Sequence, residues 1–289
     1  VEIRGLHVNK PYLEGWRDSL IIERETYATK FRVLVDEPEL NLNSAPQKSR
    51  LFYDKLGFPD PGTPGRVGRN VIQSRSTNKP AVERLRTILK QQGKFEGDTK
   101  EILNTLSDYQ RVQKMLSSYV ENILKYIDID GCVHPSYKVT GTETGRLSAV
   151  DPAIQTIPRP DDRYGAICRS AFVAPPGYTF VIVDYSQGEL RLAAGLSGDE
   201  FLLKVYEEGR DLHSEVAIAM YGDHFTKAQR VLCKMFNFSY LYGGTEHSFA
   251  ESAGLPLDQA VKFVHNYNRV MPRLARWKRE QEAERKSDV

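Results

Sequence analysis

A long amphipathic pattern between residues 102 and 127 constrains the fold more than any other feature of the chain. Apolar residues recur there at the three- and four-residue spacing of one helix face. They are Leu103, Leu106, Val112, Leu116, Val120, Ile123 and Leu124. A second helical pattern runs from Pro11, a residue suited to a first helical turn, to about Val35. Together these patterns predict a helical lobe over roughly the first 127 residues.

Shorter helices are expected elsewhere in that lobe. Asn43-Ser44 followed by Gln47 indicates a capping box, which would open a helix that ends at Gly57. Another helix is expected over residues 80–92. Between them, residues 61–80 contain no acidic residue. Their cations are Arg66, Arg69, Arg75 and Lys79. Such a stretch is either a solvated loop or a loop that contacts phosphates, and both readings stay open.

Composition changes after residue 130. Residues 131–180 are rich in Gly, Pro and Thr, which is typical of strands and loops, and residues 178–183 form an apolar run that predicts a buried strand. After Glu189 the pattern returns to helices. We expect them at about 199–208, 213–221, 226–242, 257–269 and 272–286. The chain is therefore expected to be a mixed α+β protein.

Bulk composition excludes some classes of protein. Of the 289 residues 40% are hydrophobic and 27% charged, as in an ordinary globular protein. The chain has no apolar run long enough to cross a bilayer and no start that resembles a secretion signal. Cys132, Cys168 and Cys233 form no CxxC pair, which argues against a disulfide framework or a zinc site and suits a reducing cytosol. The net charge is +2, so nucleic-acid binding would depend on where the charges lie.

Asp184 directly follows the apolar run at residues 178–183. A carboxylate at the end of a buried strand is held on a rigid element facing a cleft, where oxygen ligands can bind Mg²⁺. Many strands also end in Asp simply as a turn residue. Asp184 alone therefore leaves catalysis and a plain turn both open.

Four residues at intervals of four carry a more specific signal. Arg230, Lys234, Phe238 and Tyr242 lie on one side of a predicted helix and are followed by Gly243-Gly244. Cations suit a triphosphate, and flat rings suit a base and a sugar. The alternative is a coincidental stripe on an amphipathic helix. His213, at the start of another predicted helix, adds a third possible phosphate donor.

Several segments resemble, in the same order, those of family A (DNA polymerase I-like) DNA polymerases. Residues 184–191 are similar to motif A of that family, and residues 230–243 match its motif B. Other similar segments are 41–44, 109–119, 144–148, 151–152, 155–158 and 209–213. The resemblance is collinear and spans essentially the whole chain.

The resemblance implies a right-hand polymerase architecture with a helical thumb, a partial palm sheet and partial helical fingers. Residues 1–20 would begin the palm–thumb junction and residues 21–130 would form the thumb. Residues 131–200 would form palm with motif A, and residues 201–289 fingers with the motif B helix. The implied activity is template-directed DNA synthesis, with dNTPs added to a primer 3′-hydroxyl by two Mg²⁺ ions.

The resemblance also assigns roles to residues. Asp184 and the Tyr185 carbonyl would bind metal, and Arg230, Lys234 and His213 would grip the triphosphate. Lys234 would also protonate the leaving pyrophosphate or, alternatively, only compensate charge. Implied nucleotide contacts are Tyr185, Ser186, Gln187, Glu189, Phe238 and Tyr242. Implied DNA contacts are Lys114, Thr144, Arg146, Gln155 and Gly243.

Three of these nucleotide contacts have specific implications. Glu189 would act as a steric gate against a ribose 2′-hydroxyl, which disfavours a single-subunit RNA polymerase. Phe238, which lacks a hydroxyl, would discriminate against dideoxynucleotides. Tyr242 would stack near the templating base.

Departures from the family pattern matter as well. Gly188 replaces a bulky aliphatic residue of motif A, so we expect a roomier and less stringent nucleotide pocket. Ala153 and Thr156 stand where the family has asparagines, so minor-groove contacts are not expected there. The His-Asp-Glu of motif C is absent from the sequence, and with it the second metal-bridging aspartate.

We therefore expect a polymerase region that stops before motif C, with an open palm edge and exposed apolar surface. Its expected partners are primer–template DNA, dNTPs and a second polypeptide carrying motif C. No membrane partner is expected, and the setting is DNA replication in the cytoplasm of a bacterial or virus-infected cell. The alternative function is a catalytically silent fragment that binds primer–template without extending it.

Overall fold

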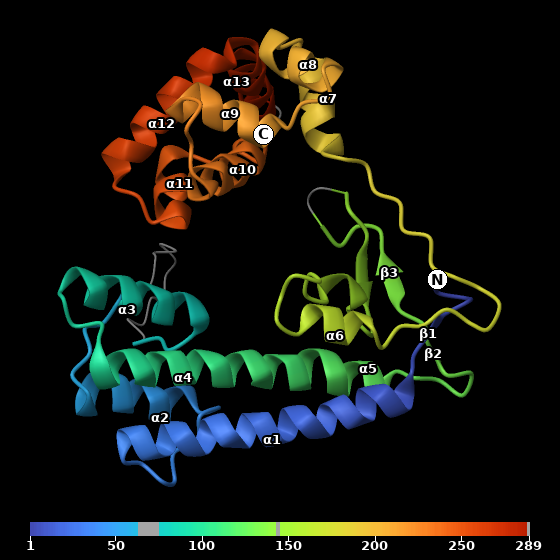
Figure 1. Cartoon of the computed structure of the whole chain (residues 1–289), viewed down its shortest axis with the longest axis vertical. Helices are drawn as coiled ribbons and strands as arrows, with labels where there is room; N and C mark the ends of the chain where they lie inside the picture. Colours follow the sequence, from blue (N-terminus) through green and yellow to red (C-terminus); the bar gives the residue numbers. More distant parts are fainter. Residues whose placement is uncertain (63–74, 143–144, 288–289) are drawn as a thin grey trace. The chain divides into compact units, whose positions relative to one another are not determined.

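The computed structural model describes residues 1–62, 75–142 and 145–287 of the chain (Figure 1). These residues form two compact units, Val1–Phe180 and Val181–Val289, called here the N-terminal and C-terminal units. Each unit is built around its own buried apolar residues. Across the described ranges, no helix combines the length and apolar character needed to cross a membrane.

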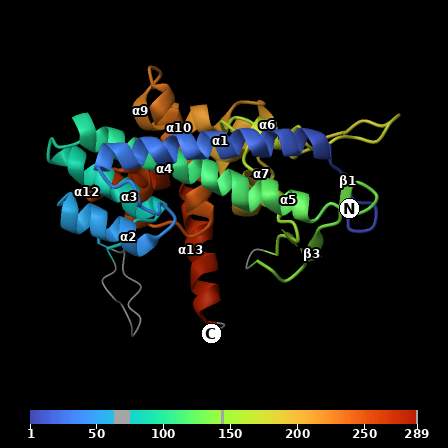
Figure 2. The same cartoon turned by 90° about the horizontal axis from the view of Figure 1, so that it is seen from below.

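Two long helices form the spine of the N-terminal unit. Helix α1 (Lys10–Val35) packs along α4 (Gly97–Lys114), as Figures 1 and 2 show. Helix α4 continues through a π-helical turn, η2 (Met115–Val120), into α5 (Glu121–Lys125). The Asn9 side chain accepts from the Tyr12 N–H and opens α1, and Asp36 closes it in a left-handed conformation. Both long helical patterns are thus confirmed. The helix predicted at residues 102–127, however, begins at Gly97 and contains a π turn that its periodicity did not predict.

Short helices complete this helical part. They are α2 (Ala45–Ser49), the π-helical turn η1 (Arg50–Lys55) and α3 (Lys79–Gln91). The Ser44 hydroxyl accepts from the Gln47 N–H, as predicted. Gln47 Oε1, however, accepts from the Asn41 N–H at 2.7 Å, so the predicted reciprocal half of the capping box is wrong. The Gln47 amide oxygen therefore accepts from the loop residue Asn41 and not from the Ser44 N–H, as a capping box would require.

Two small antiparallel pairs provide the β structure. Strand β1 (Leu6–His7) pairs with β2 (Cys132–Val133), with Leu6 opposite Val133. Strand β3 (Ser136–Lys138) pairs with β4 (Ser148–Val150), with Tyr137 opposite Ala149. A 3₁₀ turn, η3 (Ile154–Thr156), and helix α6 (Gly165–Arg169) follow. The predicted mixed α+β class is confirmed, with helices dominating.

The predicted buried strand at residues 178–183 is wrong. Val181, Ile182 and Val183 are 82%, 91% and 87% exposed, and the described residues contain no strand that pairs with them. An apolar β-rich run becomes a buried strand only where a neighbouring strand takes up its backbone groups and another layer covers its side chains. Neither partner is present among the described elements.

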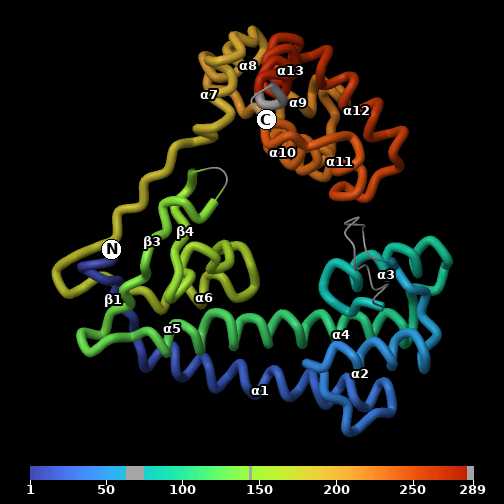
Figure 3. Tube along the Cα trace, turned by 180° about the vertical axis from the view of Figure 1, so that it is seen from behind, coloured from blue at the N-terminus to red at the C-terminus, as the bar shows by residue number. Residues whose placement is uncertain are grey.

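The C-terminal unit is entirely helical in its described elements, which gather into one bundle (Figure 3). They are α7 (Gly188–Ser197), α8 (Glu200–Glu207), α9 (Leu212–Tyr221), α10 (Lys227–Leu241), α11 (Glu246–Ala253), α12 (Leu257–Val270) and α13 (Pro272–Ser287). The Phe236 ring lies at the centre of the bundle, 4.6–5.4 Å from four other ring centroids. All five predicted helices are confirmed. Helices α7 and α11 were not predicted, although Thr245 and Ser248 form a capping box at the start of α11.

Candidate functional site

Helix α10 presents the predicted stripe of cations and rings on its less buried side. Thr226 and Gln229 form a capping box that starts the helix, with the Gln229 N–H donating to the Thr226 hydroxyl at 3.2 Å. The opposite side packs into the bundle core through Cys233, Phe236 and Tyr240. The apolar side therefore fixes the rotation of α10. On the other side Lys234 is exposed, Arg230 and Phe238 are half-buried, and the exposed Tyr242 follows the last residue of the helix.

The end of α10 depends on two glycines. Gly243 has a φ of +79°, a left-handed conformation in which an L side chain is strained. At Gly244 a Cβ would lie 2.6 Å from the Ser239 carbonyl oxygen, which accepts from the Gly244 N–H at 2.8 Å. The helix therefore ends at Leu241 with Tyr242 as its C-terminal cap, and Tyr242 is 54% exposed.

Arg230, the first cation of the stripe, is held by α9. Its Nε and Nη2 donate to Asp211 Oδ2 at 3.0 and 2.8 Å, and its Nε also lies 3.0 Å from the Ser214 hydroxyl. Asp211 caps α9 by accepting from the Ser214 N–H at 2.9 Å. Burial would raise the pKa of Asp211, but hydrogen bonds from Ser214 and Arg230 lower that pKa overall. An ionised Asp211 thus places the guanidinium beside the first turn of α9.

His213 is the second residue of α9 and is buried. Its Nδ1 is 2.9 Å from the Asn237 amide nitrogen, and its ring centroid is 5.8 Å from that of Phe238. Burial lowers the pKa of His213; the charge of Asp211 opposes this shift, and the charges of Arg230 and Lys234 add to it. The structure thus places His213 close enough to Arg230 and Lys234 for their charges to act on its ring.

Lys234 is exposed and makes no hydrogen bond or ion pair with another described residue. Its neighbour Arg230, in contrast, is already paired with Asp211. Lys234 is therefore the member of the stripe with a charge not engaged by the parts of the chain that the structure describes. A phosphate oxygen is the kind of group that such an ammonium binds.

Asn237 was missed by the sequence analysis. It is completely buried in α10 and contacts His213 through its side chain. The sequence feature that could have drawn attention to Asn237 is a polar amide among apolar residues, directly before Phe238. Such a signal does not identify a partner on another helix.

Residues Ser186 and Gln187 of the motif A segment are tied to neighbouring helices. The Ser186 carbonyl accepts from Arg191 Nε at 2.9 Å, and the Arg191 guanidinium lies 4.4 Å from the Tyr206 ring centroid. The Tyr206 hydroxyl donates to Gln187 Oε1 at 3.1 Å. Burial raises the pKa of Tyr206 to about 12, so this hydroxyl keeps its proton at neutral pH.

Asp184 and Tyr185 lie just before that anchored turn, and both are exposed. The expectation that a buried strand holds Asp184 at the edge of a cleft is wrong here, because the preceding residues are extended and uncovered. A carboxylate with a backbone carbonyl beside it provides the hard oxygen donors that Mg²⁺ prefers. These donors fit one side of a magnesium site.

Gly188 and Glu189 begin α7, directly after the anchored turn. Gln187 precedes them in a left-handed conformation with a φ of 55°. A Cβ added to Gly188 would lie 3.2 Å from the Tyr185 Cβ, which is tighter than nearly all such contacts. A side chain at position 188 would therefore press against Tyr185. Glu189 is half-buried in the first turn of α7, where the helix dipole favours a negative charge.

The predicted DNA contacts lie in the N-terminal unit, apart from Gly243. Lys114, exposed at the end of α4, has its Nζ 5.9 Å from the Tyr119 ring centroid and lines a cavity of about 350 Å³. Gln155 Oε1 accepts from the Ala149 N–H at 2.6 Å, and Arg146 is exposed. Thr144 lies outside the described residues.

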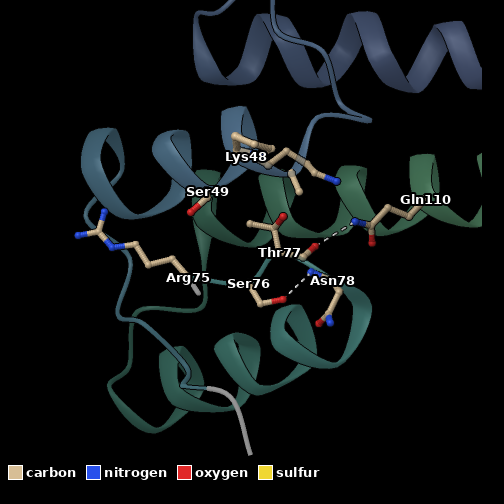
Figure 4. A pocket seen from close by; sticks show the side chains of 9 residues that line it. Lys48, Ser49, Arg75, Ser76, Thr77, Asn78 and Gln110 are labelled. Atoms are coloured by element: carbon tan, nitrogen blue, oxygen red, sulfur yellow. Dashed lines mark hydrogen bonds between the residues drawn. The ribbon is translucent and has the colours of Figure 1, made fainter. Parts of the chain in front are cut away.

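The described end of the basic stretch, from Arg75 to Asn78, borders a pocket of about 590 Å³ (Figure 4). Lys48 and Arg75 line it together with Asn78 at the start of α3. The Asn78 N–H donates to the Ser76 hydroxyl at 3.3 Å, and Gln110 Nε2 donates to the Thr77 carbonyl at 3.3 Å. Burial lowers the pKa of Lys48. Of the four cations in the basic stretch, Arg75 thus lines this pocket, Lys79 lines the 350 Å³ cavity beside Lys114, and Arg66 and Arg69 fall outside the described residues.

A separate group of potential metal ligands lies in the N-terminal unit. Atoms of Asp130, Cys132 and His134 are all within 4.8 Å of one another. His134 already uses both ring nitrogens, with Nδ1 2.8 Å from the Glu2 carbonyl and Nε2 3.0 Å from Asp130 Oδ2. Asp130 also accepts from the Cys132 N–H at 2.9 Å. These bonds explain the cluster as a tie between the first residues and β2.

Comparisons with known proteins cover nearly the whole chain. The sequence model described as DNA polymerase family A matches residues 10–289. The thermostable DNA polymerase I of Thermus thermophilus is 33% identical over 283 residues, which are 96% of this chain and 32% of that protein. DNA polymerase I of Helicobacter pylori is 30% identical over 273 residues, 94% of this chain and 28% of that protein.

One solved structure matches the fold of the chain. It is the POL domain of Pol1 from M. smegmatis in complex with DNA primer-template and dNTP, with a TM-score of 0.82 and 24% identity. The match covers 99% of this chain and 48% of that one. The chain spans about a third of the length of the curated relatives named above.

Proposed function

The chain belongs to DNA polymerase family A, and from that premise we propose that it supplies the thumb, part of the palm and the nucleotide-binding helix of a template-directed DNA polymerase. In this proposal residues 1–20 begin the palm–thumb junction and residues 21–130 form the thumb. Residues 131–200 belong to the palm, and residues 201–289 to the fingers. The observation that carries the proposal is the stripe on the less buried side of α10, which joins two cations to two aromatic rings.

The stripe fits a deoxynucleoside triphosphate in order along the helix. Arg230 and Lys234 would bind phosphate oxygens, Phe238 would pack against sugar and base, and Tyr242 would stack near the templating base. Phosphoryl transfer needs positioning and charge stabilisation more than covalent chemistry. Arg230 is positioned in advance by Asp211, and Lys234 has a charge that no described residue engages.

Asp184 and the Tyr185 carbonyl would hold Mg²⁺ in the complete enzyme. When bound, two such ions activate the primer hydroxyl and stabilise the leaving pyrophosphate. The bonds from Arg191 and Tyr206 to Ser186 and Gln187 would steady the segment that carries these oxygen donors. We propose that the second bridging carboxylate comes from a motif C that these 289 residues do not contain, on a second polypeptide or a further segment.

Primer–template DNA is the proposed partner of the N-terminal unit. Lys114, Arg146, Gln155 and Thr144 would contact it, as would the basic stretch beside the pocket of Figure 4. Phosphate contacts position a duplex without reading its sequence, which suits an enzyme that accepts any template. The proposed setting is DNA replication in the cytoplasm of a bacterial or virus-infected cell.

Nucleotide binding tests the proposal on this chain directly. Titration with Mg²⁺–dATP would be followed by calorimetry for the unmodified chain and for Lys234→Ala. We expect Lys234→Ala to weaken binding about tenfold or more. Lys227→Ala, which removes an exposed lysine from the first turn of the same helix, should leave the affinity unchanged. Equal affinity in all three proteins would contradict a nucleotide role for the stripe.

Primer extension then separates a polymerase from a silent binding fragment. The assay uses a primed DNA template, Mg²⁺ and four dNTPs, with and without a polypeptide carrying the His-Asp-Glu segment of a family A palm. We expect binding without extension by this chain alone, and extension by the pair that Asp184→Ala abolishes. Extension by this chain alone would contradict the need for a second carboxylate. Binding without extension in every combination would support the silent fragment.

A further inference from the structure

The contact between Asn237 and His213 joins α10 to α9. Asn237 is 0% exposed and His213 is 4% exposed, so the position of neither side chain is explained by contact with solvent. The Asn237 amide nitrogen lies 2.9 Å from His213 Nδ1, well within hydrogen-bond distance. An amide N–H₂ can only donate, so Nδ1 must accept in this arrangement.

This direction of donation determines which ring nitrogen carries the proton. A neutral imidazole has one protonated nitrogen, and when Nδ1 accepts, the proton is on Nε2. Burial keeps the ring neutral by lowering the pKa of His213. Nε2 has no hydrogen-bond partner among the described residues. The ring therefore has a donor N–H that the described part of the protein does not use.

Asn237 is poorly explained as a stabilising residue. Its Oδ1 is buried and has no hydrogen-bond partner in the described structure. An unsatisfied buried polar atom costs roughly 1–3 kcal/mol, whereas an apolar side chain of similar shape avoids that cost. The buried amide oxygen of Asn237 therefore carries an energetic cost, and the bond of the amide nitrogen to His213 is the interaction that its side chain makes.

We propose that Asn237 is a positioning residue that holds His213 as the Nε2-protonated tautomer, so that Nε2–H donates to the triphosphate bound along α10. The inference rests on the proposed function and adds a residue to it. Without the Asn237 donor, the proton of the neutral ring is free to move to Nδ1. Nε2 then becomes an acceptor and repels a phosphate oxygen.

The tautomer is measured first, on the unmodified 289-residue chain. Nitrogen-15 NMR distinguishes protonated from unprotonated ring nitrogens, and His213→Gln identifies the His213 signals by their loss. We expect an unprotonated Nδ1 and a protonated Nε2 at pH 7.5. A protonated Nδ1 would overturn the proposal without any variant at position 237.

Asn237→Asp provides the sharpest variant, because a carboxylate accepts where the amide donates. The new acceptor should draw the proton to Nδ1 and raise the pKa of His213. The charged groups acting on the ring in the native chain are Asp211 from its own helix cap, and Arg230 and Lys234 from α10. All three are unchanged in the variant, so a shift in the ring signals reports on position 237. Unchanged signals would contradict the inference.

Nucleotide affinity supplies the second measurement. We expect Asn237→Leu and His213→Gln each to weaken Mg²⁺–dATP binding about tenfold, and the double variant to lose no more than either single variant. Additive losses would show that Asn237 does not act through His213. If the unmodified chain binds no nucleotide, the proposed function fails, and the tautomer measurement still decides whether Asn237 orients the ring.

Discussion

Asp211 Oδ2 accepts from two nitrogens of the Arg230 guanidinium, Nη2 at 2.8 Å and Nε at 3.0 Å. The same carboxylate oxygen caps α9 through the Ser214 N–H. One side chain thus starts one helix and fixes the first cation of another. The position of Arg230 for phosphate binding and the start of α9 therefore depend on the same carboxylate.

Asp211→Ala should lower the free energy of unfolding by roughly 1–2 kcal/mol, because it removes a helix cap together with the partner of a guanidinium. Urea unfolding followed by circular dichroism measures the change. Asp223→Ala is the matched control, since Asp223 is an exposed aspartate before α10. Equal effects of the two substitutions would contradict a capping role for Asp211.

Two glycines of α7 should respond differently to a methyl group. Gly195→Ala should stabilise the chain by roughly 0.5–1 kcal/mol, because its Cβ would meet no atom within 4 Å. Gly188→Ala should gain less, because its Cβ would lie 3.2 Å from the Tyr185 Cβ. Thermal unfolding compares the two variants. In a completed polymerase, Gly188→Ile should lower misincorporation, and unchanged misincorporation would count against a roomier pocket.

The contribution of His213 to the stability of the chain should fall as the pH drops from about 7 to 5. The folded state depresses the pKa of His213 below its ordinary value of 6.5. Its stabilising contribution is therefore complete above the unfolded pKa and is lost as the pH falls towards the folded pKa. Urea unfolding at several pH values should show a weaker dependence in His213→Gln. His265→Gln, at an exposed position of α12, should retain the original dependence.

Ile182→Lys should leave stability within about 0.5 kcal/mol of the unmodified chain, because the side chain is 91% exposed. Leu190→Ala in α7 should instead cost roughly 2–5 kcal/mol, because Leu190 is buried in the bundle core. Light scattering should show less self-association for Ile182→Lys, since a charge interrupts an exposed apolar run. A large loss of stability in Ile182→Lys would show that this run is covered.

Lys114→Ala should weaken primer–template binding and reduce the magnitude of its salt slope by roughly 0.9, the value for one lost phosphate contact. Fluorescence anisotropy at several salt concentrations measures both quantities. Lys125→Ala is the matched control, because Lys114 and Lys125 are both exposed and each lies over the ring of a neighbouring tyrosine. A salt slope unchanged in Lys114→Ala would remove this residue from the DNA contacts.

Local features of the chain were predictable from the sequence because neighbouring residues encode them. The periodicity of residues 102–127 predicted the long helix, and the four-residue spacing from Arg230 to Tyr242 predicted a stripe along α10. Helix geometry repeats every 3.6 residues, so a few turns of sequence are enough to show which side is apolar. Collinear motifs likewise sufficed to identify the family.

Contacts between distant residues were decided only by the tertiary structure. Nothing in the sequence paired Arg230 with Asp211 or Asn237 with His213, because such pairs depend on how two helices rotate and pack together. The apolar run before Asp184 was predicted as a buried strand and is exposed instead. Its residues have the propensity for a strand, but burial requires a neighbouring strand and a covering layer that no local pattern can supply.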